Sequence, residues 1–457
     1  MAGVTSDGLR HPSRRGSTDV NTTRVLVLGG GFGGVYAALH LEKAFGGRAD
    51  VEITLVSRDN FFLFTPMLHE VAASDLDITH IVSPLRTLLH KTTVFIGDVK
   101  KIDVRRKRVT VAHGFDLHDH HLAFDHLVVA LGSITNFYGL RGLEERALTM
   151  KTLGDAIDLR NRVIAALEEG DTECAAGGDG LLTFVVAGGG FAGVETIAGL
   201  NDFVRGALKF YPRLGQNRIR MVLVHSGPVI LSELGEELGA YAQAKLARRG
   251  IEIITDARVA SFGDHGVTLA DGRCIPSRLV VWTAGTSPHP LLHDLPCALD
   301  RGRIVVDETL AVPGWPGVWA LGDCAVVPDV RTGRPHPPTA QHALREARTV
   351  ARNIGGAIDG RAPRPFRFRT IGQLAAIGRR TGVARIFGVN FSGFVAWWLW
   401  RTIYLSKLPR FEKKVRVAID WTLDLLFTKD FVQFLTVRAP SMSMPPEMVG
   451  LRDEVMR

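Results

Sequence analysis

The stretch "VLVLGGGFGGVYAALHL", from Val25 to Leu41, decides the architecture of the first part of the chain. Its apolar start is typical of a parallel strand that is buried on both faces, and its end has helical character. Between the two, Gly29 permits a tight turn, Gly31 lets the backbone approach a pyrophosphate, and Gly34 lets the helix pack on the strand. The helix N-terminus then favours the anion, so the stretch predicts a dinucleotide-binding turn.

A second stretch of the same design, "FVVAGGGFAGVETIAGL", runs from Phe184 to Leu200. One dinucleotide needs one such turn, so two turns indicate two dinucleotides, such as FAD and NAD(P)H in a flavoprotein that accepts a hydride. The alternative is a pair of glycine-rich turns without a ligand. The candidate cofactor-binding residues of the two turns are Gly29, Gly31, Phe32, Gly33 and Gly34, followed by Gly188, Gly190, Phe191 and Gly193.

The strand after each turn should end in an acid that binds the adenosine ribose, and the chain departs from this pattern twice. After the first turn, Ser57 and Arg58 stand where the acid is expected. After the second turn, His225 stands there. A carboxylate at that place repels a 2′-phosphate, whereas a histidine does not, so the choice between NADH and NADPH stays open.

The composition limits the other classes of function. The chain has 457 residues, a formal net charge of +8 and four cysteines that form no CxxC pair and no ligand spacing typical of a metal site. No aromatic–basic recognition motif supports nucleic-acid binding. Residues 1–23 are polar, and we expect them to form a disordered tail.

Three later segments carry a more specific pattern. "VVWTAGTSPHP" (Val280–Pro290) contains Ala284 and Gly285, and it echoes "LVVALGS" (Leu127–Ser133), which contains Ala130 and Gly132. "GVWALGDCA" (Gly317–Ala325) carries Gly322 and Asp323, and "PPTAQHALREA" (Pro337–Ala347) follows. In this order, together with the two turns, they resemble the two-dinucleotide flavoprotein reductases. The resemblance implies that Asp323 bonds the ribityl chain of FAD.

Within that superfamily the chain resembles the type II NADH:quinone oxidoreductases. The resembling segments are "NFFLFTPMLHEVAAS" (60–74), "GGGFAGVETIAGL" (188–200), "AQHALREA" (340–347) and the tail 391–427. The resemblance implies non-covalent FAD, a nicotinamide cofactor that docks against the flavin, and a membrane quinone as acceptor. It also implies that Thr65 and Pro66 lie near the isoalloxazine and that Glu195 lies between nicotinamide and flavin.

The quinone motif of that family is AQxAxQ, and here it begins at Ala340 and Gln341 but ends in Arg345. We expect Gln341 near the flavin edge, and the arginine puts the quinone contacts in question. Glu195 and Gln341 are the candidate catalytic residues, and Glu195 and His342 are candidate proton donors. The alternative for Glu195 is a solvated residue in the first turn of a helix.

The scattered cysteines exclude a redox pair, so electrons are expected to pass from flavin directly to an acceptor. Two other functions stay open. The acceptor can be a soluble protein or small molecule, or the chain can be a redox sensor that turns over slowly.

The tail changes in composition after residue 365. Val395–Trp400 is apolar and aromatic, basic residues follow between Lys407 and Arg416, and Val415–Phe427 has the pattern of an amphipathic helix. This combination favours a segment that lies in the membrane interface, at an anionic lipid surface on the cytoplasmic face of the cell membrane. The alternative is a helical pair packed on the protein itself or on a second subunit, and a homodimer is expected. On this interpretation, deletion of 391–457 releases the protein from membranes and spares its NADH–ferricyanide activity.

The predicted fold class is α/β, with two Rossmann-like dinucleotide-binding domains and a C-terminal membrane-docking helical segment. We expect a discontinuous FAD-binding domain at 24–150 and 283–365, an NAD(P)H-binding domain at 151–282, and the docking or dimerisation segment at 366–457.

Overall fold

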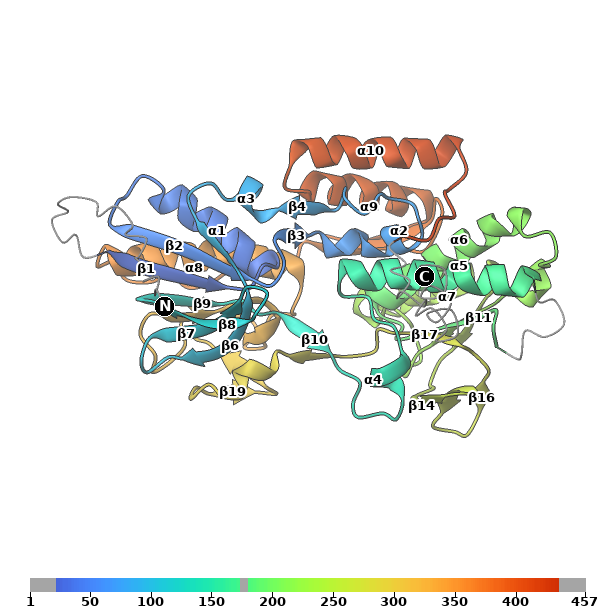
Figure 1. Cartoon of the computed structure of the whole chain (residues 1–457), viewed down its shortest axis with the longest axis horizontal. Coiled ribbons are helices and arrows are strands. Elements are labelled where there is room, and N and C mark those ends of the chain that lie inside the picture. Colours follow the sequence, from blue (N-terminus) through green and yellow to red (C-terminus); the bar gives the residue numbers. More distant parts are fainter. Residues whose placement is uncertain (1–21, 173–179, 435–457) are drawn as a thin grey trace, which may run out of the picture. The chain divides into compact units, whose positions relative to one another are not determined.

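The computed structural model describes residues 22–172 and 180–434. The chain forms two compact units (Figure 1). Unit 1 contains the segments up to Phe62, Pro84–Ser133 and Pro288–Thr370. Unit 2 contains Leu63–Ser83, Ile134–Ser287 and the chain from Ile371 onward. Most of the predicted N-terminal tail lies outside the described residues, and Thr23 already belongs to the first strand.

Unit 1 is built on a parallel sheet with the strand order β21-β9-β1-β2-β5. Its strands are β1 (Thr23–Leu28), β2 (Val51–Ser57), β5 (Thr93–Ile96), β9 (His126–Val129) and β21 (Val318–Ala320). β1 is central, because Val25 pairs with Ile53 of β2 on one side and with His126 of β9 on the other. Its last four residues are fully buried, which explains why the sequence is apolar without alternation.

Helices and small sheets complete unit 1. The helices α1 (Phe32–Phe45) and α8 (Ala340–Ile358) pack side by side (Figure 1). The remaining elements are α3 (Leu85–Leu88), an antiparallel sheet of β6 (Asp98–Asp103), β7 (Arg108–His113) and β8 (His118–Ala123), and a sheet of β19 (Leu299–Asp300), β20 (Arg303–Val305) and β22 (Ala325–Val326).

Unit 2 repeats the same design with a parallel sheet in the order β13-β12-β11-β17. Its strands are β11 (Thr183–Ala187), β12 (Arg220–Val224), β13 (Ile251–Ile254) and β17 (Leu279–Trp282), and its helices are α2 (Leu68–Ala72), α4 (Leu143–Arg146), α5 (Leu153–Thr172), α6 (Phe191–Ala207) and α7 (Glu236–Arg248). An antiparallel sheet of β14 (Val259–Gly263), β15 (Gly266–Leu269) and β16 (Cys274–Ile275) adds to it.

Four short strands lie where the chain passes from one unit to the other. They are β3 (Phe61–Leu63), β4 (Val82–Pro84), β10 (Ser133–Thr135) and β18 (Thr286–Pro288).

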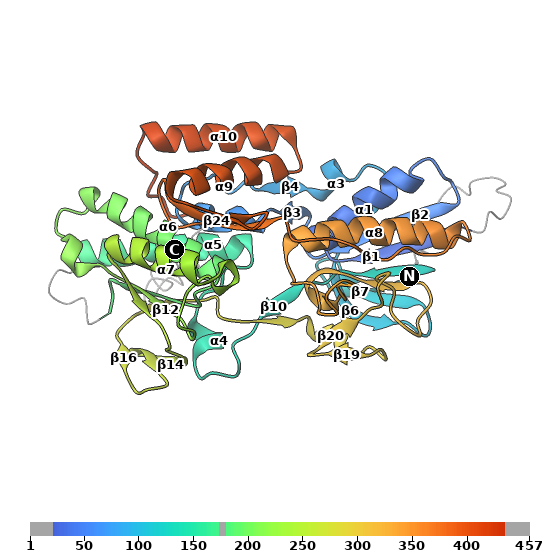
Figure 2. The same cartoon turned by 180° about the vertical axis from the view of Figure 1, so that it is seen from behind.

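The C-terminal part of unit 2 is a sheet covered by two helices. The sheet contains β23 (Gly372–Ala376), β24 (Gly382–Ile386) and β25 (Val389–Ser392), and the helices are α9 (Gly393–Lys407) and α10 (Phe411–Leu426). α9 lies over the sheet and α10 lies beyond α9 (Figure 2). Among the described residues, no helix is both long enough and apolar enough to cross a bilayer.

The two parallel sheets confirm the predicted fold class, and each carries its glycine turn at the carboxyl end of a central strand. Gly29 has φ +112° and Gly188 has φ +119°, values that favour glycine. A Cβ on Gly34 would overlap the carbonyl oxygen of Gly29, and a Cβ on Gly193 would overlap that of Gly188. The same close approach of helix and turn therefore occurs in both units.

The substitution Gly34→Ala tests this close approach. The added methyl group meets backbone rather than a flexible side chain, so we expect a loss of about 1–3 kcal/mol in the free energy of unfolding. Gly47→Ala is the matched control, because its Cβ would meet nothing within 4 Å. Urea unfolding of both variants measures the difference, and equal stabilities would contradict the packing described for Gly34.

Candidate active site

The first glycine turn leaves an open space in front of Gly31. A Cβ on Gly31 would meet nothing within 4 Å, while those on its neighbours Gly29, Gly33 and Gly34 would overlap other atoms. The helix α1 begins at Phe32, so the positive end of its dipole lies at this space. The turn therefore fits the pyrophosphate of a dinucleotide, as its sequence predicts. Phe32 is half-buried, and its ring packs edge-on against Phe62 at 5.0 Å.

Ser57 ends β2 beneath this turn. Its side chain is buried, its Oγ donates to the carbonyl of Asp59 at 2.7 Å, and it occupies the space that a Cβ on Gly30 would need. Arg58 is exposed and lies 3.8 Å from the Asp59 carboxylate. Ser57 therefore shapes the turn, while Arg58 and Asp59 supply the charges at this strand end.

The loops after β9 and β21 place four more predicted residues in unit 1. Ala130 is buried, and its carbonyl lies against Gly29, while Gly132 has φ +67°. The Asp323 carboxylate accepts a hydrogen bond from Ser133 Oγ at 2.8 Å. Gly322, with φ +72°, donates its N–H to the carboxylate of Glu346 on α8 at 2.8 Å. The loop that carries Asp323 is therefore fixed from two sides.

The second glycine turn has the same open geometry. A Cβ on Gly190 would meet nothing within 4 Å, and α6 begins at the half-buried Phe191. The N–H of Gly189 donates to Nδ1 of His225 at 3.1 Å. Because Nδ1 accepts this bond, the proton of the neutral ring lies on Nε2. His225 thus supports the turn and retains one donor.

The loop after β17 contains the predicted residues Ala284 and Gly285. Ala284 is exposed. A Cβ on Gly285 would lie 2.5 Å from the Tyr138 ring, and the Gly285 carbonyl accepts the N–H of Asn136 at 3.1 Å. A side chain at 285 would displace Tyr138.

Thr65 and Pro66 begin a short 3-10 helix, Thr65–Met67, which leads directly into α2. Thr65 is exposed and Pro66 is half-buried. The ring of His69, on α2, bonds the Pro66 carbonyl.

Glu195 is buried, with 8% of its surface exposed, so it is not the solvated helix residue that the sequence left open. Its Oε1 accepts the N–H of Ala376 at 3.0 Å and the indole N–H of Trp400 at 2.9 Å. Its Oε2 lies 3.7 Å from Nδ1 of His69, which is longer than a hydrogen bond.

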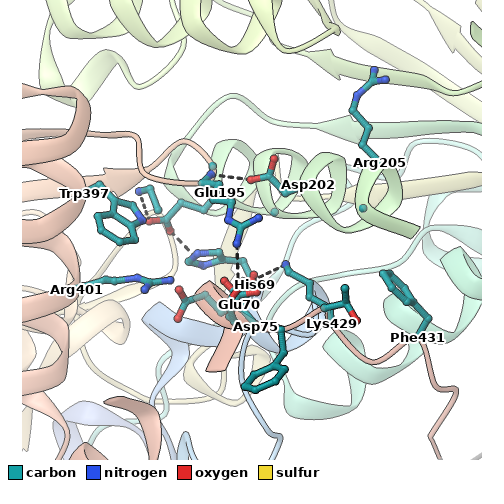
Figure 3. Close-up of a pocket in the computed structure, with 18 of the residues that line it drawn as sticks. His69, Glu70, Asp75, Glu195, Asp202, Arg205, Trp397, Arg401, Lys429 and Phe431 are labelled. Carbon is teal, nitrogen blue, oxygen red and sulfur yellow. Dashed lines mark hydrogen bonds and ion pairs between the residues drawn. The ribbon is translucent and has the colours of Figure 1, made fainter. Parts of the chain in front are cut away.

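Glu195 and His69 line a cavity of about 390 Å³ within unit 2 (Figure 3). Glu70 and Asp75 project into it from the chain around α2, and Arg401 projects from α9 (Figure 3). Lys429 binds Asp75 at 2.5 Å. The cavity is therefore lined by both signs of charge.

Burial sets the acid–base state of this cluster. It raises the pKa of Glu195 to about 8 and that of Glu70 to about 8, and it lowers the pKa of His69 to about 3. Near neutral pH both carboxyls hold a proton and the imidazole is neutral. Since the native state binds these protons more tightly than the unfolded chain, their contribution to stability is lost as the pH rises from the ordinary carboxyl range to about 8.

The predicted quinone motif lies in the first turns of α8, in unit 1. Ala340 and Gln341 are half-buried, and the Gln341 carbonyl accepts from Arg345 Nη1 at 2.7 Å. The Arg345 guanidinium stacks on the Phe368 ring at 4.1 Å. Arg345 is thus engaged within its own unit.

His342 is buried, and its ring nitrogens face the hydroxyls of Thr339 at 2.7 Å and Thr370 at 3.4 Å. Burial lowers its pKa to about 4, so the ring is neutral at pH 7. This state does not favour the predicted role of His342 as a proton donor.

The described cysteines have no redox partner. Cys274, Cys297 and Cys324 are free thiols, and Cys174 lies outside the described residues. Burial raises the pKa of Cys324 to about 11, which makes it unreactive. Within residues 22–172 and 180–434, no group of three or more His, Cys, Asp or Glu residues is arranged to hold a metal ion.

Sequence reasoning did not find Trp400, His69, Glu70 or Glu346. For Glu346 the sequence held one usable signal: its carboxylate lies four residues after His342, on the face of α8 that is otherwise buried. The partners of Glu70 and Glu195 come from the distant helices α9 and α10, which no local pattern indicates.

The open space at each turn can be tested with one methyl group. We expect Gly31→Ala to weaken FAD binding about tenfold or more, ~1.4 kcal/mol, without loss of apoprotein stability, because the methyl occupies only the ligand's space. Gly190→Ala is the matched variant, and we expect it to raise the KM for the nicotinamide cofactor at unchanged flavin content. Flavin titration and steady-state kinetics distinguish the two, and equal flavin loss in both would contradict the assignment.

Comparison with known proteins agrees with these features. A sequence profile of the pyridine nucleotide-disulphide oxidoreductases matches residues 23–347, and one of the NDH2 C-terminal domain matches residues 371–430. The chain is 34% identical over 426 residues to the type II NADH:quinone oxidoreductase Ndh of Mycobacterium tuberculosis, which covers 89% of each protein. It is 33% identical over 405 residues to the demethylphylloquinone reductase NdbB of Synechocystis, which covers 87% of this chain and 95% of that protein.

Among solved structures, NDH2 from Plasmodium falciparum in complex with NADH superimposes with a TM-score of 0.82 at 19% identity, over 90% of this chain and 100% of that one. That likeness shows a shared fold. Because the first profile covers more than half of the chain and the mycobacterial relative matches along most of its length, the chain belongs to the pyridine nucleotide-disulphide oxidoreductases and, among them, to the type II NADH:quinone oxidoreductases.

Proposed function

We propose that this protein oxidises NADH and passes two electrons to a membrane quinone without pumping protons. The observation that carries the proposal is the pair of open glycine turns in a chain whose described cysteines form no redox pair. Two dinucleotides can bind, and the cysteines within the described ranges provide no pair for a disulfide relay. The names of the relatives from M. tuberculosis and Synechocystis support a quinone as acceptor rather than a soluble molecule.

FAD is proposed to lie on the turn Gly29–Gly34, with Asp323 at its ribityl chain, in a domain of residues 24–150 and 283–365. Bound FAD would supply the two-electron chemistry between NADH and the quinone. The protein's own part is to hold the pyrophosphate at the N-terminus of α1 and to fix the Asp323 loop through Ser133 and Glu346.

NADH is proposed to lie on the turn Gly188–Gly193, in a domain of residues 151–282, with Glu195 at its nicotinamide end. His225 supports the turn through Gly189 and presents an Nε2–H donor to the adenosine side. This N–H can donate either to a ribose hydroxyl or to a 2′-phosphate, so the kinetic test compares NADPH directly with NADH.

The lipid surface is proposed to meet the outer faces of α9 and α10. Trp398 of α9 is 54% exposed, and Ile419 and Leu426 of α10 are 51% and 73% exposed. The polar side of α10 points the other way: the carboxylate of Asp420 binds His80, and Lys413 donates to the Thr79 carbonyl at 2.7 Å. A helix that turns some polar side chains inward and leaves several large apolar side chains exposed is suited to a hydrocarbon boundary.

The basic cluster predicted for lipid attraction is smaller than its sequence indicates. Lys413 is buried, Lys414 donates to the Ser406 carbonyl at 2.8 Å, and Arg410 pairs with Glu412 at 2.6 Å. Lys407 and Arg416 remain exposed for an anionic surface. The cytoplasmic face of the membrane and a homodimer stay predictions.

The function is tested by anaerobic stopped-flow on the lipid-reconstituted protein. Flavin absorbance is expected to bleach on addition of NADH and to recover on addition of a menaquinone or ubiquinone analogue. NADPH is compared at equal concentration. Bleaching without recovery would indicate another acceptor, and absence of bleaching with both nucleotides would contradict the dehydrogenase.

Membrane docking is tested with Ile419→Glu combined with Leu426→Glu. Each exposed apolar side chain contributes about 1.5–3 kcal/mol when buried, so we expect binding to anionic vesicles to fall more than tenfold. Phe115→Glu is the control, since Phe115 is an exposed aromatic residue of unit 1 between β7 and β8. Cosedimentation of the double variant at the parent level would exclude this face as the docking surface.

A further inference from the structure

The two donors that hold Glu195 both belong to the C-terminal part of unit 2. Ala376 ends β23, and Trp400 lies in the middle of α9. Trp400 is fully buried, at 0% exposure, and its ring contacts those of His69 at 5.5 Å and Tyr404 at 4.8 Å. A buried indole N–H needs an acceptor, and here the acceptor is a carboxyl group of α6.

The neighbouring helix α10 also donates a buried indole N–H to a carboxyl group. Trp421 of α10 donates its indole N–H to Oε2 of Glu70 at 3.1 Å. The guanidinium of Arg401 lies over the ring of Trp397 at 4.3 Å and over that of Trp421 at 4.6 Å. The helix pair with the exposed apolar face is therefore attached to the rest of unit 2 through two buried carboxyl groups.

The hydrogen bonds at Glu195 decide where its proton lies. Oε1 accepts two N–H donors, so in the protonated acid the hydrogen must be on Oε2. Oε2 is the oxygen that faces His69 and the cavity (Figure 3). Loss of the indole donor would leave Oε1 with the Ala376 N–H alone and remove a bond that favours the charged form.

Several charged and titratable groups surround Glu195. Among the contacts of the described residues, none of these groups donates a hydrogen bond to its Oε1, which accepts from Ala376 and Trp400. Those that line the cavity or act on Glu195 are His69, Glu70 and Asp75 on and after α2, Asp202, Arg205 and Lys209 on and after α6, Arg379 after β23, Arg401 and Tyr404 on α9, Asp424 on α10, and Lys429 beyond it.

We propose that Trp400 is a positioning residue for Glu195: it fixes Oε1 as the acceptor, leaves Oε2 to carry the exchangeable proton, and so makes the lipid-facing helices part of the reaction site. The proposal rests on the proposed function for the role of Glu195 in the reaction. It also revises the expectation from sequence that deletion of 391–457 spares NADH–ferricyanide activity, because that deletion removes an indole that Glu195 needs.

The test replaces Trp400 in the full-length, FAD-loaded protein by 3-benzothienylalanine, which keeps the ring shape and has no N–H. Infrared titration of the oxidised protein follows the protonated carboxyl band of Glu195, identified by its loss in Glu195→Gln. We expect the carbonyl frequency to rise and the titration midpoint to move up by about one pH unit, roughly tenfold in proton affinity. Trp400→Phe is a second variant with the same expectation, should the analogue incorporate poorly.

Trp397→Phe is the matched control, because it removes an indole from the same helix and keeps an aromatic face for Arg401. Its carboxyl band should match the parent's. An unchanged Glu195 band in a folded Trp400 variant would overturn the positioning role. The pH profile of quinone reduction should move in the same direction as the band, and a band that moves without the profile would overturn the link to the reaction. Absence of quinone reduction in the parent would refute the proposed function alone, since the infrared titration needs no turnover.

Discussion

The close approach of a helix to a glycine turn is the constraint on which both halves of the molecule depend. In each unit the helix after the central strand lies so near the turn that a single methyl group on Gly34 or Gly193 would overlap a backbone oxygen. This packing leaves an open space at Gly31 and at Gly190, each beside the N-terminus of a helix. Backbone geometry alone therefore makes both turns suitable for binding an anion.

Buried carboxyl groups form the second layer of organisation. Glu346 holds the Asp323 loop through Gly322, Glu195 holds β23 and α9, and Glu70 holds α10. An isolated buried charge would be costly, so burial raises the pKa values of these acids to about 7 or 8 and each accepts at least one N–H. Such groups connect distant segments of chain and remain able to exchange a proton near neutral pH.

The sequence predicted the parts that depend on local geometry. The glycine turns, their strands and helices, and the α/β class follow from steric rules that act over a few residues. The bond from Trp400 to Glu195 joins residues 205 apart, and no local rule reports it. In α10 the periodicity indicated two faces, but not which one is buried. Asp420 and Trp421 face inward because each has a partner there: Asp420 binds His80, and Trp421 donates to Glu70.

The position of α9 and α10 after both glycine turns in the sequence has a consequence for synthesis. A ribosome makes both glycine turns and all of α6 long before Trp400 and Trp421. Until those indoles arrive, Glu195 and Glu70 lack donors that they have in the finished protein, and the exposed apolar face of α10 does not yet exist. The hydrogen bonds that hold Glu195 and Glu70 and the exposed apolar face of α10 therefore form at the same stage of synthesis. If that face meets lipid, as proposed, the nascent chain completes the surroundings of Glu195 only when it can also bind a membrane.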